Sequence, residues 1–221
     1  MQIILVKLSK EISSIILINI DICKKLKPSI MFKQFFNCKK ILFFLLLVVS
    51  FLVSAQKMVL LPTGLMDAEN VEVRKNYIVL NIANKTSKQL YDESIKFINK
   101  NYKNPDEVIK GKTEGEYLKF VTYAPHFINV KNGLAKVPFN VEYTTELSFK
   151  DGRVKYEIID LRIFNDSNYT LNITGGGISF FIFNKKGELK KEETKIDIEN
   201  YFNKNISILS DFLKGENSEN W

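Results

Sequence analysis

The strongest constraint on the fold is an unbroken alternation of apolar and polar residues from Lys136 to Phe149. Successive side chains of a β-strand point to opposite faces, so this alternation predicts a long strand with one dry face and one wet face. Such strands are typical of antiparallel sheets that are covered on one side only. The dry set is Val137, Phe139, Val141, Tyr143, Thr145, Leu147 and Phe149, and the wet set is Pro138, Asn140, Glu142, Thr144, Glu146 and Ser148.

Turn signals on both sides of this strand predict antiparallel neighbours. Asn132-Gly133 precedes the strand and is suited to the two positive φ values of a type I′ hairpin turn. Asp151-Gly152 follows the strand as a second two-residue turn. This second turn sets the register on the dry face, which pairs Phe149 with Val154, Leu147 with Tyr156 and Thr145 with Ile158.

The same register has two consequences along the following strand. Glu146 lies opposite Glu157 on the wet face, a mildly unfavourable pair that the diagonal Lys155 offsets. Beyond Ile158 the apolar phase shifts by one residue, which indicates a β-bulge. Further strands are expected at 77–82, 107–110, 117–123 and 178–183. A polar, glycine-rich stretch precedes the last of them.

Two amphipathic helices are predicted, one near each end of this set of strands. The first covers 86–102, begins with a capping box of Thr86 and Gln89, and ends before Pro105. The second runs from about 194 to 213 and precedes Gly215, which suits a left-handed C-cap. The dry face of the sheet is where both apolar stripes can be buried. We therefore predict an α+β fold with two helices packed on one face of an antiparallel sheet.

The segment 39–57 reads KKILFFLLLVVSFLVSAQK and could be a membrane anchor, a core helix or a cleaved leader. Its apolar run, Ile41–Val53, would be about 20 Å long as a helix, which is short for a hydrocarbon layer of roughly 30 Å. The run is apolar nearly all round, unlike a core helix with a polar face. Preceding lysines and the small residues Val53-Ser54-Ala55 predict a signal peptide cleaved between Ala55 and Gln56.

A leader of ordinary length would begin at Met31, so we favour 31–55 as the signal peptide and 1–30 as a doubtful N-terminal extension from an over-extended gene start. The alternative is a single, unusually long leader. The mature part would comprise a linker or short strand at 56–76, one α+β domain at 77–214 and a frayed tail at 215–221. After cleavage we expect no stable membrane anchor, and a soluble protein in the periplasm or outside the cell.

Removal of the leader changes the charge and the cysteine content of the chain. The full sequence carries a net charge of +7, but residues 1–55 hold eight lysines and two acids, so residues 56–221 carry +1. The basic balance that would favour nucleic-acid binding therefore belongs to the leader. Cys23 and Cys38 also precede the cleavage site, so the mature chain has no disulfide, thiol nucleophile or thiolate metal site.

Two stretches together resemble a known bacterial family. TSKQLYDESIKFINKNYKNPDEVI, followed by VEYTTELSFKDGRVKYEIIDLRIF, is similar to the domain of unknown function with TBP-like fold (family number 4468) that occurs in exported proteins of Bacteroidetes. The resemblance covers about 77–165 and lies in a helix stripe, a strand and the Phe149–Tyr156 hairpin. It implies a fold and an export route, and it implies no activity, cofactor or partner.

Few residues are candidates for chemistry. His126 is the one histidine of the chain, and no partner constellation accompanies it, so we interpret it as a loop or edge residue. Asp92-Glu93 lies early in the first helix, where acids favour the helix dipole. Gly175–Gly177 lacks the context of a phosphate-binding loop. The lysines at 185, 186, 190 and 191 interleave with acids, as on a solvated face.

We therefore predict no catalytic, cofactor-binding or metal-binding residue. The leading hypothesis is a non-enzymatic module that binds or scaffolds a protein, peptide or glycan of the cell envelope through the open sheet face, a sheet edge or a helix surface. The alternative is a hydrolase-like enzyme in which His126 meets a carboxylate. Nucleic acid is not an expected partner, because Glu142, Glu146 and Glu157 on the wet face would repel phosphate.

Overall fold

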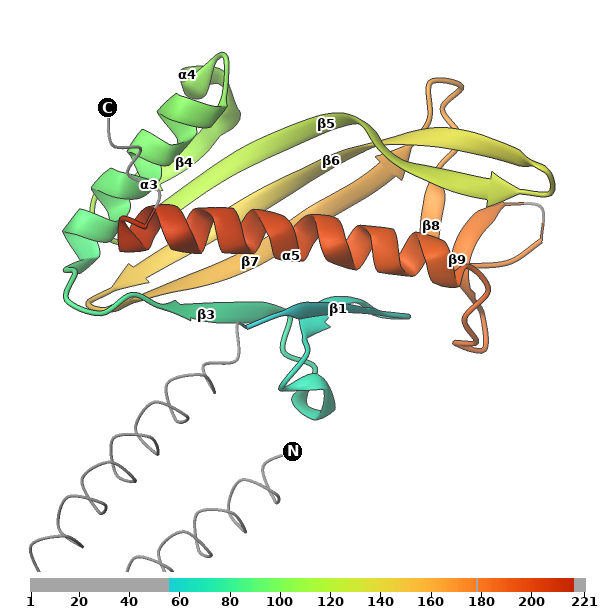
Figure 1. The fold of residues 1–221 in the computed structure, drawn as a ribbon, viewed down its shortest axis with the longest axis horizontal. Helices are drawn as coiled ribbons and strands as arrows, with labels where there is room; N and C mark the ends of the chain where they lie inside the picture. Colours follow the sequence, from blue (N-terminus) through green and yellow to red (C-terminus); the bar gives the residue numbers. More distant parts are fainter. Residues whose placement is uncertain (1–55, 178, 217–221) are drawn as a thin grey trace, which may run out of the picture. The chain divides into compact units, whose positions relative to one another are not determined.

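The computed structural model describes residues 56–177 and 179–216. Two helices lie on one face of a five-stranded antiparallel sheet, whose strands are ordered β3-β7-β6-β5-β4 (Figure 1). The predicted α+β fold is therefore confirmed. The helices are α3 (Ser87–Asn101) and α5 (Glu192–Lys214), and the strands are β3 (Tyr77–Asn81), β4 (Ile109–Thr113), β5 (Tyr117–Asn132), β6 (Ala135–Lys150) and β7 (Arg153–Phe164).

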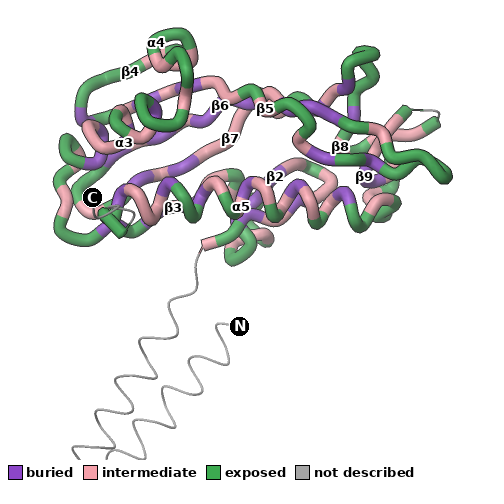
Figure 2. The backbone as a smooth tube through the Cα atoms, turned by 45° about the horizontal axis from the view of Figure 1, so that its top comes forward, coloured by how far each residue is buried: buried purple, intermediate pink, exposed green. Residues whose placement is uncertain are grey.

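The helices cover the dry side of β6, as the sequence predicts. Phe149 meets Tyr91 of α3 edge to face, with ring centroids 5.8 Å apart, and Tyr143 meets Phe202 of α5 at 5.1 Å. Buried positions alternate with more exposed ones along the strands and along α5 (Figure 2). Burial of apolar side chains from both layers, aliphatic and aromatic, is the main favourable contribution to the fold.

The predicted register around Asp151-Gly152 is confirmed pair by pair. Phe149 lies opposite Val154, and the two further predicted pairs on the dry face follow in order. Glu146 lies opposite Glu157, also as predicted. The register shifts between Glu142 and Thr144, and Asp160 has a φ of 52°, which confirms the predicted β-bulge in the second half of β7.

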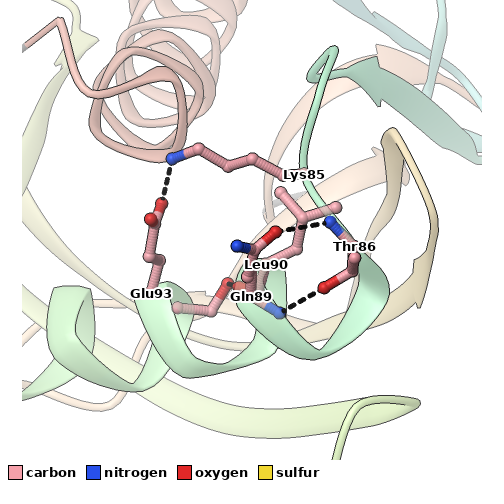
Figure 3. A network of polar contacts seen from close by, with 6 residues as sticks. Lys85, Thr86, Gln89, Leu90 and Glu93 are labelled. Atoms are coloured by element: carbon pink, nitrogen blue, oxygen red, sulfur yellow. Dashed lines mark hydrogen bonds and ion pairs between the residues drawn. The ribbon is translucent and has the colours of Figure 1, made fainter.

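Helix α3 begins at the predicted capping box (Figure 3). The Gln89 backbone N–H donates to Thr86 Oγ1, and the Thr86 backbone N–H donates to the Gln89 side-chain oxygen. Lys85 also forms an ion pair with Glu93 one turn into the helix. At the end of α5, Gly215 adopts the left-handed conformation with a φ of 82°, as predicted.

Two local predictions are wrong. Pro105–Val108 forms the short helix α4, and β4 starts only at Ile109, where a strand over 107–110 was expected. The fixed φ of proline suits the first position of a helix, which favours this turn. The β5–β6 turn places Gly133 and Leu134, and not Asn132-Gly133, at its two central positions, because Asn132 pairs with Ala135. Of Asn132, Gly133 and Leu134, only Gly133 has a positive φ.

Residues before the sheet form a hairpin that packs against α5. Its strands are β1 (Met58–Leu61) and β2 (Gly64–Asp67). The Met58 N–H donates to Asn203 Oδ1 at 2.8 Å, and Asn203 Nδ2 donates to the Met58 carbonyl at 2.9 Å. The Leu60 N–H donates to Glu199 Oε1 at 2.7 Å. Side chains of α5 therefore replace a neighbouring strand along this edge of β1.

A second small sheet follows β7. It pairs β8 (Leu171–Gly175) with β9 (Phe180–Asn184) in parallel. The strand expected at 178–183 is thus displaced toward the C-terminus, and its partner lies in the stretch that looked polar and irregular. Gly175 ends β8 where a Cβ atom would lie 2.9 Å from the Cβ atom of Phe181, so the close approach of the two strands requires glycine there.

Asp67 is the buried charge of the first hairpin and is fully inaccessible to solvent. It accepts hydrogen bonds from the Asn70 side chain and the Glu69 N–H, and it pairs with Lys75 at 3.2 Å. Burial by itself raises the pKa of Asp67, but the hydrogen bonds and the lysine charge outweigh it, so the pKa lies below its ordinary value of 3.8. The ionised carboxylate therefore ties β2 to the 3-10 turn η1 (Val71–Val73) and the segment before β3.

Asp67→Asn is expected to lower the free energy of unfolding at pH 7 by about 1–3 kcal/mol, because a charged hydrogen-bond acceptor is lost. Because the pKa of Asp67 is lower in the folded state than in the unfolded state, its ionised carboxylate stabilises the fold at pH values above the unfolded-state pKa. This stabilisation is lost as the pH falls through the folded-state pKa. The difference between wild type and variant should therefore shrink below about pH 4. Urea denaturation at several pH values measures it, and a pH-independent difference would contradict this role of Asp67.

Candidate functional site

One face of the five-stranded sheet lies opposite the two helices (Figure 1). We call it the helix-free face. It is made of the side chains that alternate with the core positions in each strand, and the strand pairing places these side chains in rows across the sheet. Its main members are Tyr77, Tyr117, Lys119, Tyr123, Asn140, Glu142, Thr144, Glu146, Lys155, Glu157, Ile159, Arg162 and Phe164.

Half of this face, nearest the Asp151-Gly152 turn, is a network of opposite charges. Lys119 pairs with Glu146 at 3.2 Å, and Lys155 pairs with Glu157 at 2.6 Å. The predicted offset of the Glu146–Glu157 pair by Lys155 is thus supplemented by a lysine from β5. Tyr117 donates a hydrogen bond to Glu146 at 2.7 Å. The charged side chains in this half of the face therefore already pair with one another.

The pKa values of this network follow from those contacts. Burial raises the pKa of Glu146, but hydrogen bonds from Tyr117 and Lys119 together with the lysine charges outweigh it and hold the pKa below its ordinary value. Burial and the hydrogen bond to Glu146 raise the pKa of Tyr117 to about 12. At neutral pH Tyr117 is therefore a fixed donor and Glu146 a fixed acceptor.

The other half of the face carries an aromatic and cationic cluster, formed by Tyr123, Glu142, Arg162 and Phe164 and called the Tyr123 cluster below. Tyr123, Glu142 and Arg162 lie side by side on three adjacent strands. The rings of Tyr123 and Phe164 are 6.4 Å apart and inclined by 32°. Because β6 separates the strands that carry them, the two rings lean toward each other over β6. The Arg162 guanidinium lies 4.5 Å from the centre of the Phe164 ring.

Polar groups of the Tyr123 cluster keep hydrogen-bonding capacity. Glu142 and Arg162 are register partners, yet they form no ion pair within the described part of the chain. Tyr123 is 54% exposed, and Arg162 is exposed as well. The exposed Tyr123 ring can stack on the flat face of a ligand ring. Glu142 can accept a hydrogen bond from the polar groups of that ligand, and Arg162 can donate one.

Asn140 supports the cluster from beneath. It lies on the predicted wet face, yet it is buried, with 5% of its surface exposed. Its side chain accepts a hydrogen bond from the His126 N–H at 2.9 Å and donates one to Asp166 at 2.8 Å. These bonds connect the bulge of β5 to the segment after β7, and so they set the positions of Tyr123 and Phe164.

His126 does not meet the requirement of the hydrolase alternative. It lies at the β5 bulge with a φ of 51°, and its side chain is exposed. Its backbone is bound by Asn140, and within residues 56–177 and 179–216 its imidazole has no hydrogen bond or ion pair with a carboxylate. The hydrolase alternative requires a carboxylate within hydrogen-bond reach of the imidazole, and no described carboxylate pairs with His126.

The other candidates from the sequence are structural or exposed. Asp92 pairs with Lys88, and Glu93 pairs with Lys85, so these acids are not a catalytic pair. Asp92 also lines an open hollow between α3 and β4 beside Lys96, Lys112 and Glu114. The described residues contain no group of three or more His, Cys, Asp or Glu side chains that could hold a metal ion. The predicted cleavage site between Ala55 and Gln56 lies at the edge of residues 1–55, which are outside the described residues.

Sequence reasoning missed the Tyr123 cluster. Phe139, Tyr143, Phe149 and Tyr156 were assigned to the core, and all four are buried as predicted. Tyr123 belongs to a strand whose alternation is broken by Pro125 and the bulge, and Phe164 follows the second bulge. The available signal was the phase shift after Ile158, which moves the last aromatic residue of β7 to the helix-free face.

The fold defines the class of this protein as an α+β domain whose antiparallel sheet is covered by helices on one side. Residues 77–164 match the family model described as "Domain of unknown function (DUF4468) with TBP-like fold". This match confirms the resemblance found in the sequence, and it extends from the first residue of β3 to the last residue of β7. It therefore includes the whole five-stranded sheet and α3, but it excludes the β1–β2 hairpin, β8, β9 and α5.

Two solved structures are similar to this chain. The crystal structure of a DUF4468 family protein from Bacteroides ovatus is 15% identical, covers 63% of this chain and 84% of its own, and has a TM-score of 0.46. The crystal structure of a TBP-like protein from Parabacteroides distasonis is 17% identical, covers 65% of this chain and 92% of its own, and has a TM-score of 0.41. The search of curated proteins returned no match. Among the described residues, no helix is both long and apolar enough to cross a membrane.

Proposed function

We propose that this domain is a non-enzymatic binding module that acts after export, in the periplasm or at the cell surface, and that it binds a glycan of the envelope on its helix-free face. The observation that carries the proposal is the Tyr123 cluster, in which an exposed aromatic ring lies beside a second ring and an arginine on a face without a covering element. The proposed export rests on the leader sequence before Gln56.

The chemistry of the cluster favours a sugar ring over the other ligands considered. A pyranose presents an apolar face of C–H groups that stacks on an aromatic ring, and a rim of hydroxyl groups that both donate and accept hydrogen bonds. Glu142 accepts only and Arg162 donates only, so together they match a pair of neighbouring hydroxyl groups. A phosphate-rich ligand is disfavoured, because the Glu142 carboxylate lies between Tyr123 and Arg162 and would repel phosphate.

The position of the cluster on rigid strands supports binding without a large conformational change. Tyr123 and Arg162 project from strands whose neighbours are paired along the sheet. Asn140 fixes the strand ends beneath them through two hydrogen bonds. A preorganised surface loses little conformational entropy on binding, so a small contact area suffices for specific, weak recognition.

Tyr123→Ala is expected to weaken glycan binding by about fivefold to tenfold, since one stacking contact is worth roughly 1 kcal/mol. Amide chemical shifts of the 15N-labelled mature chain, titrated with soluble fragments of envelope polysaccharide, would measure the affinity residue by residue. Tyr169→Ala is the matched control, because Tyr169 is 61% exposed and follows β7 outside the cluster. Equal effects of the two substitutions, or shifts confined to other surfaces, would contradict the proposal.

A further inference from the structure

The distal half of the β5–β6 hairpin forms a two-stranded arm. The pairing of β7 with β6 ends at Asn140, whereas β5 and β6 continue to pair from Ile128 and Phe139 to the turn. Residues 128–139 therefore extend beyond the five-stranded part of the sheet (Figure 1). We call this segment the β5–β6 arm.

The arm carries no acidic residue. Residues 128–139 contain two lysines, Lys131 and Lys136, and no Asp or Glu, so the arm has a net charge of +2. Residues 56–221 as a whole carry +1, with 24 basic and 23 acidic residues, which leaves −1 for everything outside the arm. The arm is therefore a positively charged projection from a nearly neutral domain.

The tip of the arm presents a leucine to solvent. Leu134 is fully exposed, with a relative accessibility of 106%, at the second position of the turn. Lys131 and Lys136 are both exposed and flank it on the two strands. A large apolar side chain at a protruding turn contributes nothing to the core, and it is available to an apolar partner.

The base of the arm is held in place, so the tip is presented in a defined position. Val130 is fully buried, and the Phe139 ring meets the Phe180 ring of β9 edge to face at 5.3 Å. Lys191, just before α5, donates from Nζ to the Lys131 carbonyl at 2.7 Å. Only the turn and its flanking lysines extend beyond these contacts.

We infer that the β5–β6 arm docks the domain on an anionic lipid surface, with Leu134 inserted among the headgroups and Lys131 and Lys136 beside them. Burial of apolar side chains and attraction between cations and anionic lipids are the two interactions that hold a peripheral protein on such a membrane. One acid opposes it: Glu193 of α5 lies 3.8 Å from Lys136 and reduces the field of that lysine. Nucleic acid is a poorer fit, because a fully exposed leucine gains nothing from phosphates.

The inference is independent of the glycan site and is tested on the mature chain, residues 56–221, with sedimented vesicles. Binding is expected to vesicles of phosphatidylcholine with 30% phosphatidylglycerol at low salt, to fall in 0.5 M NaCl, and to be absent with phosphatidylcholine alone. Leu134→Ser is expected to reduce the partition constant roughly tenfold. Replacing Lys131 and Lys136 with glutamine together is expected to reduce it roughly 25-fold, about fivefold for each charge.

Matched substitutions elsewhere control for nonspecific effects. Val73→Ser removes a similarly exposed apolar residue from η1, and Lys103→Gln removes an exposed cation between α3 and α4; neither should change partitioning more than about twofold if the arm alone binds. The inference is overturned if the mature chain ignores anionic vesicles at low salt, or if Leu134→Ser and Val73→Ser behave alike. Binding of duplex DNA that depends on Lys131 and Lys136, together with unchanged vesicle binding by Leu134→Ser, would also overturn it. Self-association of the mature chain that is lost in Leu134→Ser would overturn it as well.

Discussion

Phe202→Ala in α5 is expected to destabilise the domain by about 3–5 kcal/mol, the range found when a large buried aromatic residue is truncated. Phe202 is fully buried and meets three aromatic rings, those of Phe127, Tyr143 and Tyr201, at centroid distances of 6.1, 5.1 and 5.2 Å. The cavity would open between α5 and the sheet, where neighbours from two layers cannot easily collapse into it. Equilibrium urea denaturation followed by circular dichroism measures the loss.

Two further variants in α5 separate packing from helix propensity. Ile208→Ala removes a side chain that is 38% exposed on the same helix and is expected to cost no more than about 1 kcal/mol. Phe202→Leu keeps much of the volume and should cost clearly less than the alanine variant. A Phe202→Ala variant that is as stable as Ile208→Ala would show that α5 does not close the core as described.

Asn203→Ala is expected to destabilise the fold by about 2–6 kcal/mol, because two backbone groups of Met58 lose their hydrogen-bond partners and each buried, unpaired group costs roughly 1–3 kcal/mol. Met58 is 2% exposed, so water cannot readily replace the amide. The effect should be concentrated at β1, because Asn203 and Glu199 together bind alternate residues of its outer edge. Hydrogen exchange of the Met58 and Leu60 amides should therefore accelerate together with the loss of stability.

The control for Asn203 lies three residues earlier on the same helix. Asn200→Ala makes the same chemical change at an exposed position, so any gain in helix propensity is common to both variants. We expect this variant to stay within about 0.5 kcal/mol of wild type. If Asn203→Ala exchanged the β1 amides at the wild-type rate, the helix side chains would not be the partners that hold this strand.

Predictability from the sequence depended on whether a feature is local. The Lys136–Phe149 alternation, the turn at Asp151-Gly152 and the Thr86 capping box are short-range patterns, and the structure confirms them. The strand expected at 107–110 failed because a proline can start a helical turn as readily as it ends a helix. The β8–β9 pair was missed since its polar first strand has no apolar alternation to reveal it.

The candidate site was less predictable than the fold. The wet face of β6 was recognised, and its glutamates were interpreted as a surface that repels phosphate. Lys119, which pairs with Glu146, comes from β5, and only the strand order brings these two side chains together, whereas Lys155 and Glu157 pair within β7. Tyr123 and Phe164 lie 41 positions apart in the chain, and their contact over β6 depends on the strand order as well as on the β-bulge in β7.

The sequence by itself determined the two-layer α+β architecture, the central hairpin register and the stripes that α3 and α5 bury, because binary patterning and turn chemistry act over a few residues. The tertiary structure alone decided that α5 side chains would satisfy the edge of β1, that Asn140 would become buried, and that an arginine, a glutamate and two aromatic rings would share one surface. These arrangements depend on distances between segments far apart in the chain, which are set by packing and strand order rather than by local preference.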